Sequence, residues 1–80
     1  MTMRAKFGVT SVQDLTEHMQ SVHMTAVTNA PFDGNGHSDD NSFSKWTPNG
    51  RLEMTITNPS LKGALKVGEK YYLDFTLAPS

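Results

Sequence analysis

The sequence contains no cysteine, so neither disulfides nor a cysteine-based zinc site can hold its fold together. No apolar run approaches the roughly 20 residues that a membrane-spanning helix needs. Arg4 and Lys6 are not followed by the apolar segment of a signal peptide. Basic side chains are not in excess either, since seven Lys and Arg against eight Asp and Glu give a net charge of −1. That balance argues against a strongly basic nucleic-acid binder. From the absence of cysteine, of a membrane-spanning run and of a signal peptide, we expect a cytoplasmic protein.

The chain of 80 residues is short, and we assign residues 1–80 to a single β domain. A chain of this size buries only about 60% of its unfolded surface, so the core must be thin. Association of copies through an exposed strand edge would add buried area. We therefore predict a homo-oligomer, with the last strand as its edge.

Period-two alternation of apolar and polar residues is the main structural signal. It is strict from Lys70 to Leu77 and from Arg51 to Thr57, and it recurs over residues 3–9 and 18–28, which predicts strands there. Val12 breaks the phase of the first strand, which predicts either a bulge or the end of that strand between Gly8 and Ser11. Residues 42–47 are predicted as a further short strand. The expected core consists of Phe7, Val9, Val22, Met24, Leu52, Met54, Ile56, Tyr71, Leu73 and Phe75.

Turn-forming residues separate these strands. Residues 29–41 are rich in Gly, Asn, Asp and Pro, and we predict a flexible loop there. The segment Thr47-Pro48-Asn49-Gly50 predicts a turn that joins strand 42–47 to strand 51–57 as a hairpin. Asn58-Pro59 predicts the start of one short helical turn. The expected fold is mostly β: a small five-stranded antiparallel barrel or sandwich, OB-like or SH3-like, with one short helical turn.

Several segments together resemble a group of small uncharacterised proteins encoded by tailed bacteriophages. The likeness lies in Met3–Phe7, Val9–Val12, Phe43–Gly50, Leu52–Met54, Asn58-Pro59 and Gly68–Phe75. It spans most of the chain except residues 29–41. The resemblance implies a phage accessory protein in the host-cell cytoplasm, and it transfers no catalytic residue because the group has no assigned activity.

The loop after residue 29 spaces oxygen ligands like the start of an EF-hand, at Asp33, Asn35 and Asp39. The sixth position is Ser38 where such loops need Gly, and the twelfth is Ser44 where they need Glu. We therefore expect a solvated loop and no metal. No serine lies in a nucleophile elbow, and 80 residues leave little room for a walled active site, so we expect neither a cofactor nor enzymatic activity.

Aromatic residues interleaved with cations offer the best candidate binding face. The partner-binding candidates are Trp46, Tyr72, Lys45, Lys70 and Phe43, with Arg4 and Lys6 on the outward face of the first strand. Such sets are typical of protein hot spots and of base-stacking platforms. We favour a non-enzymatic protein that binds a host or defence protein or another copy of itself. The alternatives are a single-stranded nucleic-acid-binding OB-like module and a scavenger of a small nucleotide signal.

Overall fold

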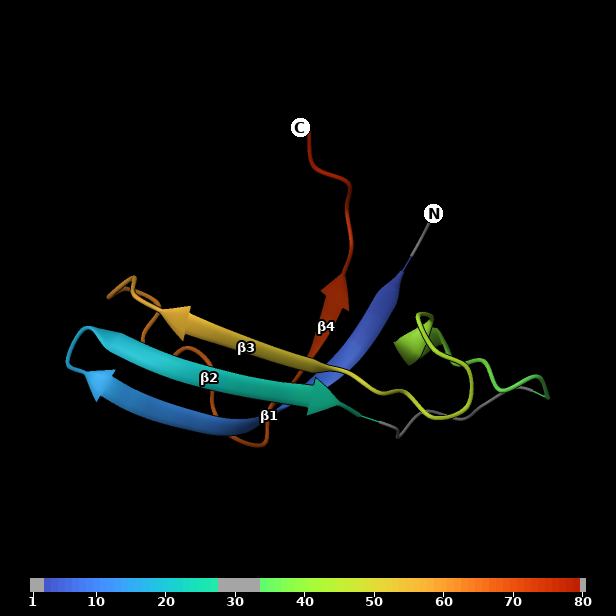
Figure 1. Ribbon diagram of the computed structural model, residues 1–80, viewed down its shortest axis with the longest axis horizontal. Coiled ribbons are helices and arrows are strands. Elements are labelled where there is room, and N and C mark those ends of the chain that lie inside the picture. The colour runs from blue at the N-terminus through green and yellow to red at the C-terminus, as the bar shows by residue number, and fades with distance from the viewer. Residues whose placement is uncertain (1–2, 28–33, 80) are drawn as a thin grey trace.

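The computed structural model describes residues 3–27 and 34–79 of the chain. Its elements, in chain order, are β1 (Arg4–Thr16), β2 (Met19–Ala26), the 3-10 helix η1 (Asp39–Asn41), β3 (Arg51–Ile56) and β4 (Lys70–Asp74). The four strands form one antiparallel sheet in the order β3-β2-β1-β4 (Figure 1). The prediction of a mostly β, antiparallel fold is confirmed.

The sheet is open, so the prediction of a five-stranded barrel or sandwich is wrong in the described part of the chain. Strands β3 and β4 are the two edges and do not pair with each other. The molecule measures 48 × 33 × 16 Å along its principal axes. Its thickness leaves room for one sheet and a single covering layer, since two stacked sheets alone lie about 10 Å apart before side chains are added on their outer faces.

Residues 42–47 do not form the predicted strand. The chain turns there after η1, and Trp46 adopts a positive φ of 63°, which an L-residue in a strand does not have. Strand β3 instead pairs with β2, so the predicted hairpin across residues 47–50 is also wrong.

The predicted helical turn after Asn58 is replaced by two hydrogen-bonded turns. The N–H of Leu61 donates to the Asn58 carbonyl and that of Ala64 to the Leu61 carbonyl, both at 3.0 Å. Gly63, at φ 86°, has a left-handed conformation that stops a helix from forming. Among the described residues, the one helical element is η1.

The phase break near Val12 is a bulge and not the end of the strand, because β1 continues to Thr16 and its pairing with β2 is interrupted once before that break. Val9 lies opposite Met24 and Ser11 lies opposite His23, so Thr10 is the extra residue. The bulge shifts the alternation by one and brings Val12 onto the same face as Val9. Both halves of this long strand therefore present apolar side chains to one core.

The core occupies one face of the sheet. Its buried apolar side chains are Ala5, Phe7, Val9, Val22, Met24 and Ile56. The predicted core residues Leu52, Tyr71 and Leu73 are half-buried and pack against this cluster. Met54 and Phe75 are 42% and 56% exposed, so their assignment to the core is wrong. Met54 lies on an edge strand, and Phe75 follows the end of β4, so neither has a strand on its outer side.

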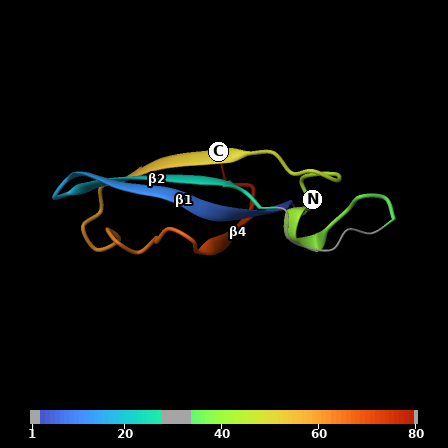
Figure 2. The same ribbon diagram turned by 90° about the horizontal axis from the view of Figure 1, so that it is seen from below.

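The connection from β3 to β4, residues 57–69, runs along one side of the sheet (Figure 2). Leu65 packs against the core cluster. The N–H of Gly63 donates to Oε1 of Gln20 at 3.2 Å, and Nζ of Lys62 donates to the carbonyls of Thr16 and Glu17. The connection is thus fastened to the β1–β2 hairpin, yet Leu61 and Val67 stay 51% and 62% exposed.

The folded chain exposes more surface than a compact monomer of its mass. Its accessible surface is 5700 Å² at 8.8 kDa, whereas the usual scaling gives about 4,800 Å². Its radius of gyration is 14.5 Å, against about 12 Å for a compact chain of this length. A single-layered sheet accounts for both differences.

Candidate functional site

A polar network occupies the sheet face opposite the core, where β1 and β4 pair. Arg4 lies opposite Asp74 and Lys6 opposite Tyr72. The Arg4 guanidinium donates to both Asp74 carboxylate oxygens, at 2.7 and 3.2 Å. It also lies over the Tyr72 ring, 4.3 Å from the centroid, in a cation–π contact. Residues far apart in the sequence therefore meet here through strand register alone.

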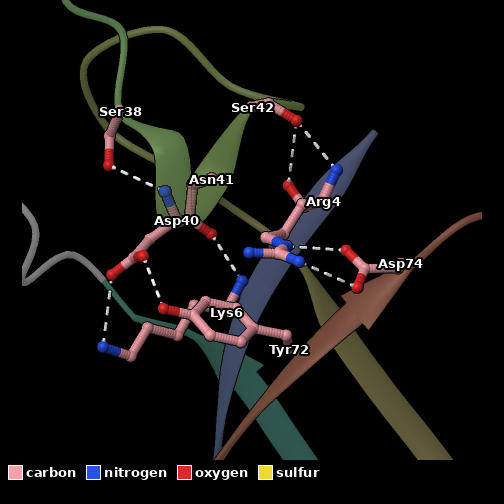
Figure 3. A network of polar contacts seen from close by, with 8 residues as sticks. All are labelled: Arg4, Lys6, Ser38, Asp40, Asn41, Ser42, Tyr72 and Asp74. Atoms are coloured by element: carbon pink, nitrogen blue, oxygen red, sulfur yellow. Dashed lines mark hydrogen bonds and ion pairs between the residues drawn. The ribbon is translucent and has the colours of Figure 1, made fainter. Parts of the chain in front are cut away.

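Helix η1 adds an acidic residue to this network (Figure 3). The Tyr72 hydroxyl donates to Oδ1 of Asp40 at 2.7 Å, and Nζ of Lys6 donates to Oδ2 at 3.2 Å. Ser38 caps the helix by accepting the Asp40 N–H. Asp40 thereby bridges β1 and β4 from outside the sheet.

The segment around η1 also supplies side chains that hydrogen-bond to the backbone of β1, at positions beyond the end of β2. Oδ1 of Asn41 accepts the Lys6 N–H at 2.8 Å, and its Nδ2 donates to the Val27 carbonyl at 2.7 Å. The Ser42 hydroxyl accepts the Arg4 N–H at 2.8 Å. Asn41 is 3% exposed, so its side chain is a buried continuation of the sheet's hydrogen bonding.

The charges of the network neutralise one another. The hydrogen bond from Tyr72, followed by that from Lys6, lowers the pKa of Asp40, and the Arg4 guanidinium lowers the pKa of Asp74. The Asp40 carboxylate raises the pKa of Tyr72. Near neutral pH both carboxylates are ionised and the phenol is protonated. Two cations therefore face two anions, which makes this face a poor phosphate-binding site.

We expect the fold to lose the stabilisation that this network provides when the pH becomes acidic. The folded-state pKa values of Asp40 and Asp74 lie below the unfolded value of about 3.9. The ionised carboxylates therefore stabilise the fold fully above that pH, and their contribution is lost as the pH falls through the folded pKa values. Asp40→Asn should lower the melting temperature at neutral pH, and its difference from wild type should shrink below pH about 4.

Melting curves recorded from neutral pH down to pH about 2 measure this effect. Asp39→Asn is the matched control, because Asp39 is the exposed neighbour in the same helix. It should follow the wild type at every pH. A difference between Asp40→Asn and wild type that stayed constant into acid would show that the charge of Asp40 does not stabilise the fold.

The structure does not bring the five predicted binding residues together: two lie on the outward face of β4, one packs against the core, and two lie in the segment after η1. Tyr72 and Lys70 share the outward face of β4, and Tyr72 belongs to the network. Phe43 is half-buried and packs against the core, on the side of the sheet opposite Tyr72. Trp46 is 53% exposed, and its ring lies against Gly36, where an added Cβ would clash. Lys45 precedes it and is exposed.

Five residues of the network were absent from the predicted set: Ser38, Asp40, Asn41, Ser42 and Asp74. Asp74 could have been found, because it alternates with Tyr72 on the outward face of a predicted strand. In the sequence, Asp40 and Asn41 lie among residues that are typical of turns. No local pattern indicates that they pack against the first strand.

A second candidate surface is an apolar groove of about 370 Å³ between β3 and the 57–69 connection. The side chains and backbone of eight residues line it: Met54, Thr55, Ile56, Thr57, Asn58, Leu61, Ala64 and Leu65. Strand β3 is an edge of the sheet, and the groove residues Met54 and Leu61 are 42% and 51% exposed. An exposed edge next to apolar pockets is the arrangement that accepts an added strand.

No protein-family model, no curated protein and no solved structure matches the chain. Within residues 3–27 and 34–79, no helix has the length and apolar character to cross a membrane. In the same residues, no three His, Cys, Asp or Glu side chains are grouped to hold a metal ion. Asp33, the first residue of the metal-loop pattern, lies outside the described residues.

Proposed function

We propose that this chain is a non-enzymatic phage accessory protein that acts in the host cytoplasm by binding another protein. The phage origin follows the sequence resemblance described above. The observation that supports binding is the apolar groove that is lined in part by β3, an edge strand of the sheet. A host or defence protein would add an extended segment to this edge and insert alternate apolar side chains between Met54 and Leu61.

The open shape of the chain leaves room for a partner. The single-layered sheet exposes about 900 Å² more surface than a compact monomer of the same mass, and the exposed residues of the groove belong to that surface. In addition, the carboxylates of Asp40 and Asp74 and the Tyr72 hydroxyl hydrogen-bond to one another or to neighbouring cations. Because these groups hold the fold together, they support the non-enzymatic part of the proposal.

The nucleic-acid alternative draws its support from Tyr72, which is 49% exposed on the face that also carries Lys70. A base could stack on its ring. Arg4 and Lys6 are already paired with acids, so few cations remain for phosphates. This makes nucleic acid the second candidate, and the experiment below separates the two.

A pull-down from infected host cells, with and without nuclease, tests the proposal. Leu61→Asp places a charge in the groove and should weaken capture of the protein partner roughly tenfold or more. Val67→Asp is the matched control, because Val67 is an exposed apolar residue of the same connection outside the groove-lining set. Its capture should equal that of wild type.

Protein binding through the groove should also depend only weakly on salt. Capture that disappears with nuclease, falls steeply with salt and weakens in Lys70→Ala would instead identify nucleic acid as the ligand. Equal loss of capture in Leu61→Asp and Val67→Asp would contradict the groove assignment.

A further inference from the structure

The apolar alternation of β4 continues beyond the end of the strand. Strand β4 ends at Asp74 because its neighbour β1 begins opposite it, at Arg4. One more hydrogen bond follows, from the Phe75 N–H to the Met3 carbonyl at 3.0 Å. Period two places Phe75 and Leu77 on the same face as Leu73, yet they are 56% and 98% exposed. The chain therefore carries a strand-like segment longer than the pairing it makes.

The outer edge of this segment has backbone groups ready for pairing. The N–H of Val9 donates to the Glu69 carbonyl and that of Phe75 to the Met3 carbonyl. Because bonded positions alternate in an antiparallel ladder, the odd-numbered residues between them face β1. The N–H and C=O groups of Lys70, Tyr72 and Asp74 therefore point to the free edge, where no described strand lies. If the alternation continues past β4, those of Thr76 point there too.

We propose that this edge, residues 70–77, pairs antiparallel with the same edge of a second copy to form a two-fold symmetric dimer. The two sheets then become one continuous sheet. The inference goes beyond the proposed function, because it concerns β4 and a second copy instead of the β3 groove and a different protein.

The alternation also selects the register of this pairing. Only registers that place residues of the same face opposite each other keep the apolar side chains together. With the two-fold axis at Leu73, Tyr71 lies opposite Phe75 of the second copy and Tyr72 opposite its Asp74. Moving the axis to Asp74 would place two carboxylates directly opposite, which is unfavourable. Moving it to Tyr72 would place Phe75 opposite Glu69 of the second copy and so remove Phe75 from the apolar contact. We therefore place Leu73 on the axis.

The surface of the chain fits an interface of this kind. Phe75 and Leu77 line an open apolar hollow of about 440 Å³ together with Met3, Thr76 and Ala78, and no other residue of the described ranges lines it. Tyr72, Phe75 and Leu77 are 49%, 56% and 98% exposed, so pairing along this edge would bury large side chains that the fold leaves in water. A two-fold contact also closes, so it does not propagate into fibres.

Light scattering on the purified chain at tens of micromolar tests the dimer. The wild type should have twice the 8.8 kDa mass of one chain. Thr76→Pro removes one N–H from the free edge and Leu77→Asp places a charge on the apolar face, so both should be monomers. Thr76→Val keeps the N–H and is the matched control, which should remain a dimer. Circular dichroism should show the same strand content in all four proteins.

A wild-type mass of 8.8 kDa at this concentration overturns the inference. A dimer that survives Thr76→Pro and Leu77→Asp overturns it as well, because the contact would then lie elsewhere. Leu61→Asp should stay a dimer, so loss of the groove partner and loss of the dimer are separate results.

Single cysteines test the register, since the chain has none of its own. Leu73→Cys should form a disulfide-linked dimer on mild oxidation, because residues opposite each other at a non-bonded position have Cα atoms about 4.5 Å apart. Phe75→Cys is the control, since its two copies would lie about 13 Å apart along the strands. Cross-linking of Phe75→Cys but not of Leu73→Cys overturns the proposed register.

Discussion

Met24→Ala should destabilise the fold by about 2–5 kcal/mol. Met24 is 2% exposed in the core, and alanine would leave a cavity there that the thin surrounding layer can fill only in part. A domain of 80 residues has a total stability of about 4–12 kcal/mol. Because 1 kcal/mol corresponds to about 4–8 °C in a domain of this size, the melting temperature should fall by roughly 10 °C or more.

Met54→Ala is the matched control for this prediction. Met54 is on the same face of the neighbouring strand β3, but it is 42% exposed. Removing its side chain should cost about 1 kcal/mol, less than Met24→Ala, because 42% of the surface of Met54 already contacts water. Urea unfolding of both variants measures the difference. Equal losses of stability would contradict the face and edge assignment, because the sequence pattern alone treats the two methionines alike.

That contrast shows how far alternation predicts a core. The period-two pattern correctly placed Phe7, Val9 and Val22 on one face, because side-chain direction is a local property of a strand. It could not show that β3 and the segment after β4 lack a neighbour on their outer side. Whether Met54 or Phe75 is buried depends on strand order and on the reach of the 57–69 connection, which are tertiary properties.

The candidate site could also be predicted only in part: its strand residues could be, and its loop residues could not. Tyr72 and Lys70 could be assigned to an outward strand face from alternation, and Arg4 and Lys6 likewise. Their neutralisation by Asp40 was not predictable, because the sequence around it reads as a solvated turn. The predicted strand 42–47 failed for a related reason: its apolar residues Phe43 and Trp46 pack from a turn instead of from a ladder.

Asn41→Ala should destabilise the fold by about 2–4 kcal/mol, although its sequence context is that of a loop. Its side chain bonds the Lys6 N–H and the Val27 carbonyl, and it is 3% exposed. Alanine would leave both backbone groups without their partner, and each buried unsatisfied group costs about 1–3 kcal/mol. Chemical unfolding should show the loss, whereas Asn49→Ala, at an exposed position, should change stability by less than about 0.5 kcal/mol.

Amide hydrogen exchange gives this prediction a local readout. In Asn41→Ala the Lys6 amide should exchange faster than the loss of global stability accounts for, because its acceptor is gone. The Phe7 amide should change only with global stability, since by the alternation of the ladder it faces β4. If both amides accelerated equally, Asn41 would stabilise the domain as a whole without serving as the partner of β1. A selective effect at Lys6 would establish that one buried asparagine replaces a strand at the point where β2 ends.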